Sequence, residues 1–129
     1  MESNQANAKT ILIVEDDTFM GSLLERKFQQ KNFLISRAIN VDEARKIIEG
    51  GKISLILLDI ILPGTDGLTF LNEIKANAQF KDIPVIITSN LGKQEEIEKG
   101  MSEGATDYIV KAHSTPGEIV QKVEAILGL

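Results

Sequence analysis

Acidic, hydroxyl and amino side chains that could perform chemistry stand directly after short apolar runs of this sequence. Glu15 and Asp16 follow the first such run, Asp59 follows a later one, and Ser89 and Lys111 close the last two. Carboxylates held close together repel one another, so they either take up protons or bind a cation. Oxygen ligands without histidine or cysteine suit a hard ion, Mg²⁺ or Ca²⁺. Vacant positions on the ion favour Mg²⁺, which keeps waters and accepts phosphate oxygens.

These side chains together indicate phosphoryl transfer. A carboxylate such as Asp59 can act as a nucleophile and become an aspartyl phosphate. The ammonium of Lys111 and the hydroxyl of Ser89 would then face the incoming negative charge. Each residue also has an ordinary explanation, because acidic residues cap helices and form turns, and lysines are usually solvated. Their joint position after four apolar runs favours the chemical explanation.

The apolar runs are predicted to be strands that bring these groups together. They cover residues 11–14, 33–38, 53–58, 84–88 and 108–110. The runs are rich in Ile, Val and Leu, and several lack a polar alternation, which is typical of strands buried on both faces of a parallel sheet. Helical patterns follow each run, so the chain is predicted to be an α/β protein with a doubly wound parallel sheet. The functional crevice of such sheets lies beyond the carboxyl ends of the strands.

The helices are predicted from apolar stripes and start signals. Asn40 and the Thr115-Pro116 pair are good helix starts. The fourth helix, residues 93–103, has only Ile97 and Met101 as large apolar side chains, so we expect it to be loosely held and open to movement or to a partner. The first helix is expected to place five apolar residues on one face: Phe19, Met20, Leu23, Leu24 and Phe28.

Composition excludes several other functions. The 129 residues suit one domain. The net charge of −5 argues against direct nucleic-acid binding, and the lack of cysteine excludes disulfides, thiolate zinc sites and thiol nucleophiles. The lone histidine, His113, is expected in a solvent-facing loop. No signal peptide or membrane-spanning run is seen, so we expect a cytoplasmic protein with a flexible N-terminal tail, residues 1–8.

Four ordered segments of the sequence resemble the receiver domain of two-component response regulators. They cover residues 11–17, 57–67, 84–89 and 104–111. The resemblance implies a receiver domain over residues 9–129. It also implies a flavodoxin-like, five-stranded sheet of order 2-1-3-4-5 with five helices.

The resemblance also implies roles for the acidic residues. Asp59 stands at the position of the phosphoacceptor, and Asp16 stands at the principal Mg²⁺-binding carboxylate. Glu15 replaces the more common Asp and would act more through water. The backbone carbonyl of Ile61 would complete the protein ligands of the Mg²⁺ cofactor.

The remaining matched positions concern the switch. Ser89, in place of the commoner Thr, corresponds to the hydroxyl that moves onto the phosphoryl group, and Lys111 corresponds to the lysine that pairs with it. Tyr108 matches the aromatic residue that changes rotamer, although an ordinary half-buried strand residue would look the same. Ala112 replaces the usual Pro after Lys111. A cis bond there would cost roughly 3 kcal/mol more than one before Pro, so the bond is either trans or held cis by the fold.

Two apolar positions bear on the lifetime of the phosphoryl group. Ile61 stands two residues after the acceptor, and Leu91 stands two after the switch serine. In this family both positions flank the path of an attacking water. Their apolar character predicts slow self-dephosphorylation.

We expect a receiver that is not a turnover enzyme and that is either a stand-alone protein or a receiver cut from a longer protein. It would take its phosphoryl group from a sensor histidine kinase or a phosphotransfer protein. A downstream protein or a second copy would then bind the face made by the fourth helix, fifth strand and fifth helix. Two alternatives stay open. One is a Mg²⁺-dependent phosphatase with an aspartyl nucleophile, whose general acid is missing at Ile61. The other is a receiver fold that acts without phosphorylation as an interaction module.

Overall fold

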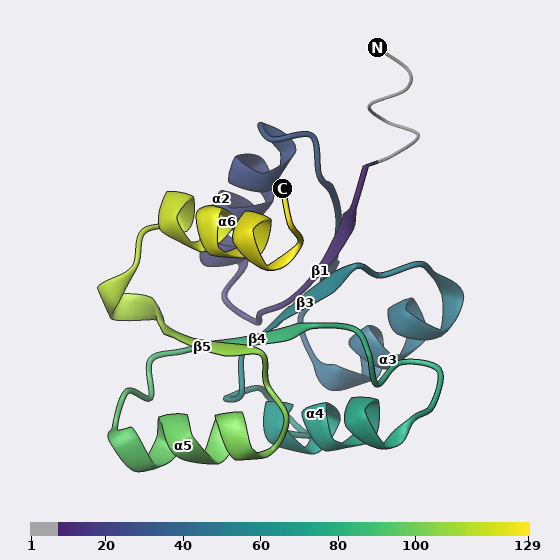
Figure 1. Ribbon diagram of the computed structural model, residues 1–129, viewed down its shortest axis with the longest axis vertical. Coiled ribbons are helices and arrows are strands. Elements are labelled where there is room, and N and C mark those ends of the chain that lie inside the picture. Colours follow the sequence, from purple (N-terminus) through teal and green to yellow (C-terminus); the bar gives the residue numbers. More distant parts are fainter. Residues whose placement is uncertain (1–7) are drawn as a thin grey trace.

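A parallel sheet forms the centre of the molecule, with helices on both faces (Figure 1). The computed structural model describes residues 8–129. The strands are β1 (Thr10–Val14), β2 (Leu34–Ala38), β3 (Leu55–Leu58), β4 (Val85–Ser89) and β5 (Asp107–Val110). They pair in parallel in the order β2-β1-β3-β4-β5. The predicted doubly wound fold and its strand order are confirmed.

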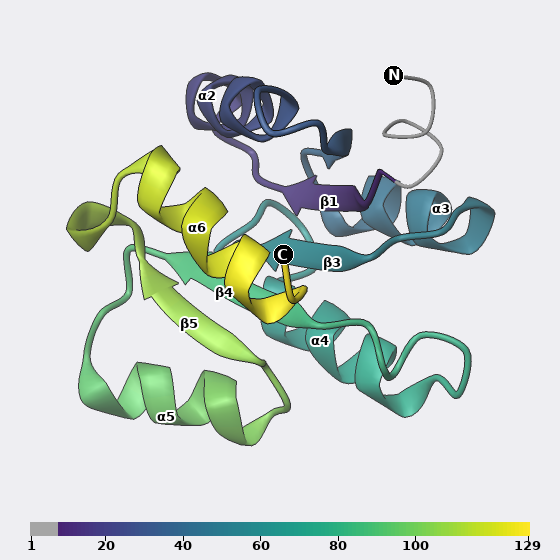
Figure 2. The same cartoon turned by 45° about the horizontal axis from the view of Figure 1, so that its top comes forward.

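Five α-helices connect and follow the strands within the described residues. They are α2 (Thr18–Gln29), α3 (Val41–Gly50), α4 (Gly67–Ala76), α5 (Gln94–Ser102) and α6 (Pro116–Ile126), with a short 3-10 helix η1 (Lys111–His113) after β5. Helices α2 and α6 cover one face of the sheet, and α3, α4 and α5 cover the other (Figures 1 and 2). The fourth and fifth helices of the sequence prediction are therefore α5 and α6.

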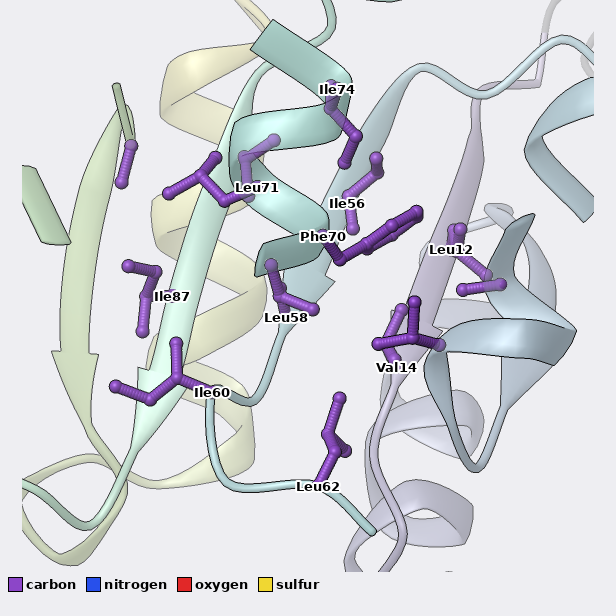
Figure 3. Close-up of a cluster of buried hydrophobic side chains, with 14 of the residues drawn as sticks. Leu12, Val14, Ile56, Leu58, Ile60, Leu62, Phe70, Leu71, Ile74 and Ile87 are labelled. Carbon is purple, nitrogen blue, oxygen red and sulfur yellow. The ribbon is translucent and has the colours of Figure 1, made fainter. Parts of the chain in front are cut away.

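Alternate residues of each central strand feed two separate hydrophobic cores. Figure 3 shows the core under α4, where Leu58 of β3 packs with Phe70 and Ile74. On the other face, Leu57 of β3 lies in the core with Phe28 of α2. Burial on both faces explains why these strands show no polar alternation.

The predicted helix starts are confirmed by their side-chain hydrogen bonds. The Asn40 side chain accepts from the N–H of Glu43 at 2.9 Å. Thr115 accepts from the N–H of Glu118, whose carboxylate accepts from the N–H of Thr115 in return. Each bond satisfies a donor that the helix itself leaves unpaired.

The predicted apolar face of the first helix is partly wrong. Phe19 is 73% exposed, while Leu24 and Phe28 are buried. Five helical residues turn through about 140° beyond a full circle, so Phe19 points well away from the face that carries Leu24. In α5, Met101 is also exposed, and Gly100 is the only buried residue of the helix.

Two further predictions concern the N-terminal tail and membrane-spanning segments. The predicted tail, residues 1–8, lies outside the described residues except for Ala8. Between residues 8 and 129 there is no helix with the length and apolar character needed to cross a membrane.

Candidate functional site

The carboxyl ends of β1, β3, β4 and β5 point to one edge of the sheet (Figure 2). A cavity of about 240 Å³ opens there. Its lining contains every predicted site residue except Tyr108, namely Glu15, Asp16, Asp59, Ile61, Ser89 and Lys111, and it also contains Asp17 and Asn90. The parallel register of the strands thus gathers groups that lie far apart in the sequence.

Asp59 occupies the centre of this site, directly after β3. Its side chain is almost fully buried, and its backbone N–H donates to the carbonyl of Val14 in β1. Oδ1 accepts from the N–H of Ile61 at 3.0 Å, and Oδ2 accepts from Nζ of Lys111 at 2.8 Å. Both carboxylate oxygens are therefore held in place before any ligand binds.

Lys111, directly after β5, links two acidic residues. Its ammonium forms ion pairs with Asp59 and with Glu15. Burial disfavours the charged ammonium, but hydrogen bonds to Asp59 and Glu15 outweigh burial and raise the pKa of Lys111. Burial raises the pKa of Glu15, and the hydrogen bond with Lys111 lowers that pKa by a smaller amount. Glu15 also accepts from the N–H of Asp17 at 3.1 Å, which fixes its position.

Three carboxylates converge in a way that fits a divalent cation. Oxygens of Glu15, Asp16 and Asp59 all lie within 4.8 Å of one another. Glu15 and Asp59 are buried, whereas Asp16 is exposed. Against these three negative charges, the ion pairs provide one ammonium, that of Lys111, so the cluster keeps a net negative charge. The oxygen-only donor set suits a hard divalent ion such as Mg²⁺ rather than Zn²⁺ or Cu²⁺.

Ser89 and Tyr108 are joined through the backbone of Leu91. Ser89 is fully buried, and its Oγ accepts from the N–H of Leu91 at 3.1 Å. The hydroxyl of Tyr108 donates to the carbonyl of Leu91 at 2.5 Å. Burial also raises the pKa of Tyr108. This link could not be predicted from the sequence, because Leu91 acts through its backbone atoms.

The segment after Lys111 settles two smaller predictions. No cis peptide bond occurs among the described residues, so the bond between Lys111 and Ala112 is trans. His113 is exposed as predicted, but it lies in the short helix η1 and not in a loop.

Gly67 belongs to the site, although no role was predicted for it. Asp66, which precedes it, caps α4 by accepting from the N–H of Thr69. A Cβ on Gly67 would lie 2.3 Å from the carbonyl oxygen of Asp59 and 2.6 Å from Cα of Ile60. Only glycine therefore lets the start of α4 lie against the segment that holds Asp59.

Comparison with known proteins agrees with this geometry. The family model described as "Response regulator receiver domain" matches residues 11–124. The transcriptional regulatory protein BaeR of Escherichia coli is 39% identical over 123 residues, which cover 94% of this chain and 49% of BaeR. ResD of Bacillus subtilis, also a transcriptional regulatory protein, is 36% identical over 96% of this chain and 50% of its own length. The chain thus spans about half the length of the curated relatives it matches.

A solved structure shows the same arrangement of elements. The crystal structure of a putative response regulator from Chloroflexus aurantiacus superimposes with a TM-score of 0.88. Its sequence is 28% identical, and the match covers 95% of this chain and all of the other.

Proposed function

This chain belongs to the receiver domain family of two-component response regulators, and from that premise we propose that Asp59 accepts a phosphoryl group from a phosphohistidine. The observation that carries the proposal is the position of Asp59 between the N–H of Ile61 and the ammonium of Lys111. Glu15 and Asp16 adjoin it in the same cavity. A carboxylate so placed is oriented for attack, and a cation beside it offsets the incoming charge.

The transfer step exchanges one bond for another. A carboxylate oxygen of Asp59 attacks phosphorus, and the bond between phosphorus and the donor's imidazole nitrogen breaks with its electron pair returning to that nitrogen. Lys111 stays close to the phosphoryl oxygens because its ion pair with Glu15 anchors it. Mg²⁺, held by Glu15, Asp16, Asp59 and the carbonyl of Ile61, would supply further charge compensation when bound.

Exposed apolar side chains at and near the cavity support a protein as the phosphoryl donor. Ile61 lines the cavity and is 56% exposed. Phe19, also strongly exposed, stands two residues after the cavity residue Asp17. Exposed apolar side chains beside an acidic cavity would contact the surface around a phosphohistidine, and a small phosphate compound would not need them. We therefore assign the donor role to a sensor histidine kinase or a phosphotransfer protein.

The signal would leave through the surface formed by α5, β5 and α6, here named the α5–β5–α6 face. The new group adds a charge of about −1.5 to −2. It would draw in the Ser89 hydroxyl, and Leu91 connects Ser89 to Tyr108 of β5. A change at Tyr108 would then bias this face toward a downstream protein or a second copy.

The two alternatives lack support from the site. A phosphatase with an aspartyl nucleophile would need a general acid two residues after Asp59, and Ile61 has no proton to give. Receiver domains are also generally not turnover enzymes. An interaction module without phosphorylation would not need the acceptor, the metal carboxylates and Lys111, yet all of them converge in one cavity.

Labelling with a small phosphodonor in the presence of Mg²⁺ tests the proposal. Intact-mass measurement should show one added phosphoryl group on the wild type and none on Asp59→Asn, and Lys111→Ala should react more slowly. Asp17→Asn is the matched control, since Asp17 lines the cavity but caps α2 and Asn caps equally well. Modification of Asp59→Asn would move the acceptor elsewhere. Turnover of a phosphate ester that Asp59→Asn abolishes would favour the phosphatase, and no labelling of the wild type would favour the interaction module.

A further inference from the structure

Helix α5 rests on the sheet through a glycine. Gly100 is its only buried residue, Ile97 is half-buried, and Met101 is exposed. A Cβ on Gly100 would lie 2.7 Å from Cδ1 of Ile87 and 3.0 Å from Cδ2 of Tyr108. The backbone of α5 therefore lies directly against these two side chains.

The two side chains that lie beneath Gly100 come from paired positions on neighbouring strands. Ile87 of β4 and Tyr108 of β5 are register partners across the two strands. The Tyr108 ring is confined on one side by Gly100, and its hydroxyl donates to the carbonyl of Leu91. The ring thus touches both α5 and the loop that precedes it.

The presence of glycine inside α5 requires an explanation. Glycine is one of the poorest helix formers, because it loses more conformational freedom on folding than other residues. In α3, Gly50 has open space around the position of a Cβ. At Gly100, by contrast, a methyl group would have to displace Ile87, Tyr108 or the helix itself.

We propose that Gly100 is a positioning residue that couples the place of the Tyr108 ring to the distance between α5 and the sheet. When the ring stays under Gly100, α5 packs closely; when the ring leaves, α5 loses its main support. The inference deepens the proposed switch, because it names the contact through which Tyr108 acts on the α5–β5–α6 face. It describes the unphosphorylated chain and can be tested without Asp59 chemistry.

Tyr108 is its own reporter in the test. It is the only tyrosine, and the chain has no tryptophan, so tyrosinate absorbance during a pH titration reports this residue alone. In Gly100→Ala, the added methyl group should crowd the ring outward and move the pKa of Tyr108 down toward its ordinary value. Amide hydrogens of α5 should exchange about fivefold to a hundredfold faster, the range expected for overpacking. Gly50→Ala is the matched control and should leave both readings unchanged.

A second substitution separates this coupling from general damage. Ile87→Val removes Cδ1, the atom nearest to the added methyl group, so the double variant should move both readings back toward the wild type. The proposal is overturned if Gly100→Ala leaves the titration and the α5 exchange unchanged, if exchange rises equally in all helices, or if Ile87→Val gives no rescue. If Gly100→Ala does not fold, Tyr108→Ala is measured instead, and unchanged exchange in α5 overturns the proposal. No arm uses Mg²⁺ or a phosphodonor, so failure here is distinct from failure to label Asp59.

Discussion

Nζ of Lys111 lies 2.8 Å from Oδ2 of Asp59, although the two residues are 52 positions apart in the sequence. The contact joins the end of β3 to the start of η1 across the cavity. The same ammonium pairs with Glu15, so Lys111 both balances the carboxylates of the fold and faces the phosphoryl group in the proposed transfer. A substitution can separate these two effects.

Lys111→Met keeps most of the side-chain volume and removes the charge. We expect the labelling of Asp59 to slow by roughly 10²–10³, the usual effect of losing one group that stabilises transition-state charge. Mg²⁺ should bind at least as tightly, because a competing cation beside Glu15 and Asp59 is gone. Labelling rates at saturating Mg²⁺ and titration calorimetry measure the two effects. Unchanged labelling, or loss of Mg²⁺ binding, would contradict this account; Lys122→Met, which removes only an exposed pair with Asp107, is the control.

Binding of Mg²⁺ should stabilise the folded chain. Free ligand at a hundred times its Kd raises the free energy of unfolding by about 2.7 kcal/mol, which a thermal melt detects. Asp16→Asn should remove most of this gain, because Asp16 belongs to the cluster of three carboxylates. Asp17→Asn should keep the gain, since Asp17 is occupied in capping α2. Equal losses in the two variants would show that general negative charge, and not a defined site, attracts the ion.

Much of the fold could be predicted because its signals are local. Apolar residues at both parities of a strand, as in Leu57 and Leu58, predict burial on two faces and hence a parallel sheet. The strand order came only from the family resemblance, since pairing between distant strands leaves no local pattern. Phe19 was wrongly assigned to the buried face of α2. Apolar residues predict the buried face of a helix only when they lie within a narrow range of angles around the helix axis.

Some residues of the candidate site could likewise be predicted from the sequence, and others could not. Asp59 and Lys111 were predicted because they end strands whose carboxyl ends share one edge. Leu91 was not predicted as the link between Ser89 and Tyr108, because it uses backbone atoms that every residue has. A close approach at glycine becomes visible only when the neighbouring atoms are known, and so the importance of Gly67 was missed.

Gly67→Ala should disturb the acceptor segment directly. The added methyl group would meet the backbone of Asp59 and Ile60, which cannot rotate away as a side chain can. We expect a loss of roughly 2–3 kcal/mol in the free energy of unfolding, in the upper part of the range for overpacking, and slower labelling of Asp59. Urea denaturation measures the first effect. Gly117→Ala is the control, because its nearest neighbour would lie 3.9 Å away; equal losses in the two variants would rule out this steric explanation.

The folded chain should become less stable at alkaline pH because the Tyr108 phenol ionises there. Burial, with smaller contributions from the charges of Glu96 and Asp59, raises the pKa of this phenol above its ordinary value of 10.0. The unfolded chain therefore loses the phenolic proton first, so this contribution to stability is complete below pH 10 and is lost as the pH rises through the folded pKa. Tyr108→Phe should lack this part of the pH dependence and lose about 1 kcal/mol at neutral pH with the hydrogen bond to Leu91. Urea unfolding at a series of pH values tests both, and identical alkaline slopes would contradict the prediction.

We expect the lifetime of the proposed phosphoryl group to depend on the apolar residues near Asp59. Ile61 lines the cavity and is 56% exposed, so a polar replacement fits without disturbing the core. A side chain that can hydrogen-bond an attacking water should lower the barrier to hydrolysis by about one hydrogen bond, which corresponds to roughly a tenfold faster loss. We expect slow loss from the wild type and about tenfold faster loss from Ile61→Asn.

Decay of the labelled protein after removal of the phosphodonor measures this lifetime. Ile39→Asn makes the same change at another exposed isoleucine, 43% accessible and outside the cavity lining, and should decay like the wild type. If the wild type loses its phosphoryl group within seconds and Ile61→Asn does not speed the loss, apolar shielding does not set the lifetime. Hydrolysis would then be governed by groups that both proteins keep, such as Lys111 and the carboxylates beside it, because those groups contact Asp59 directly or belong to the same carboxylate cluster.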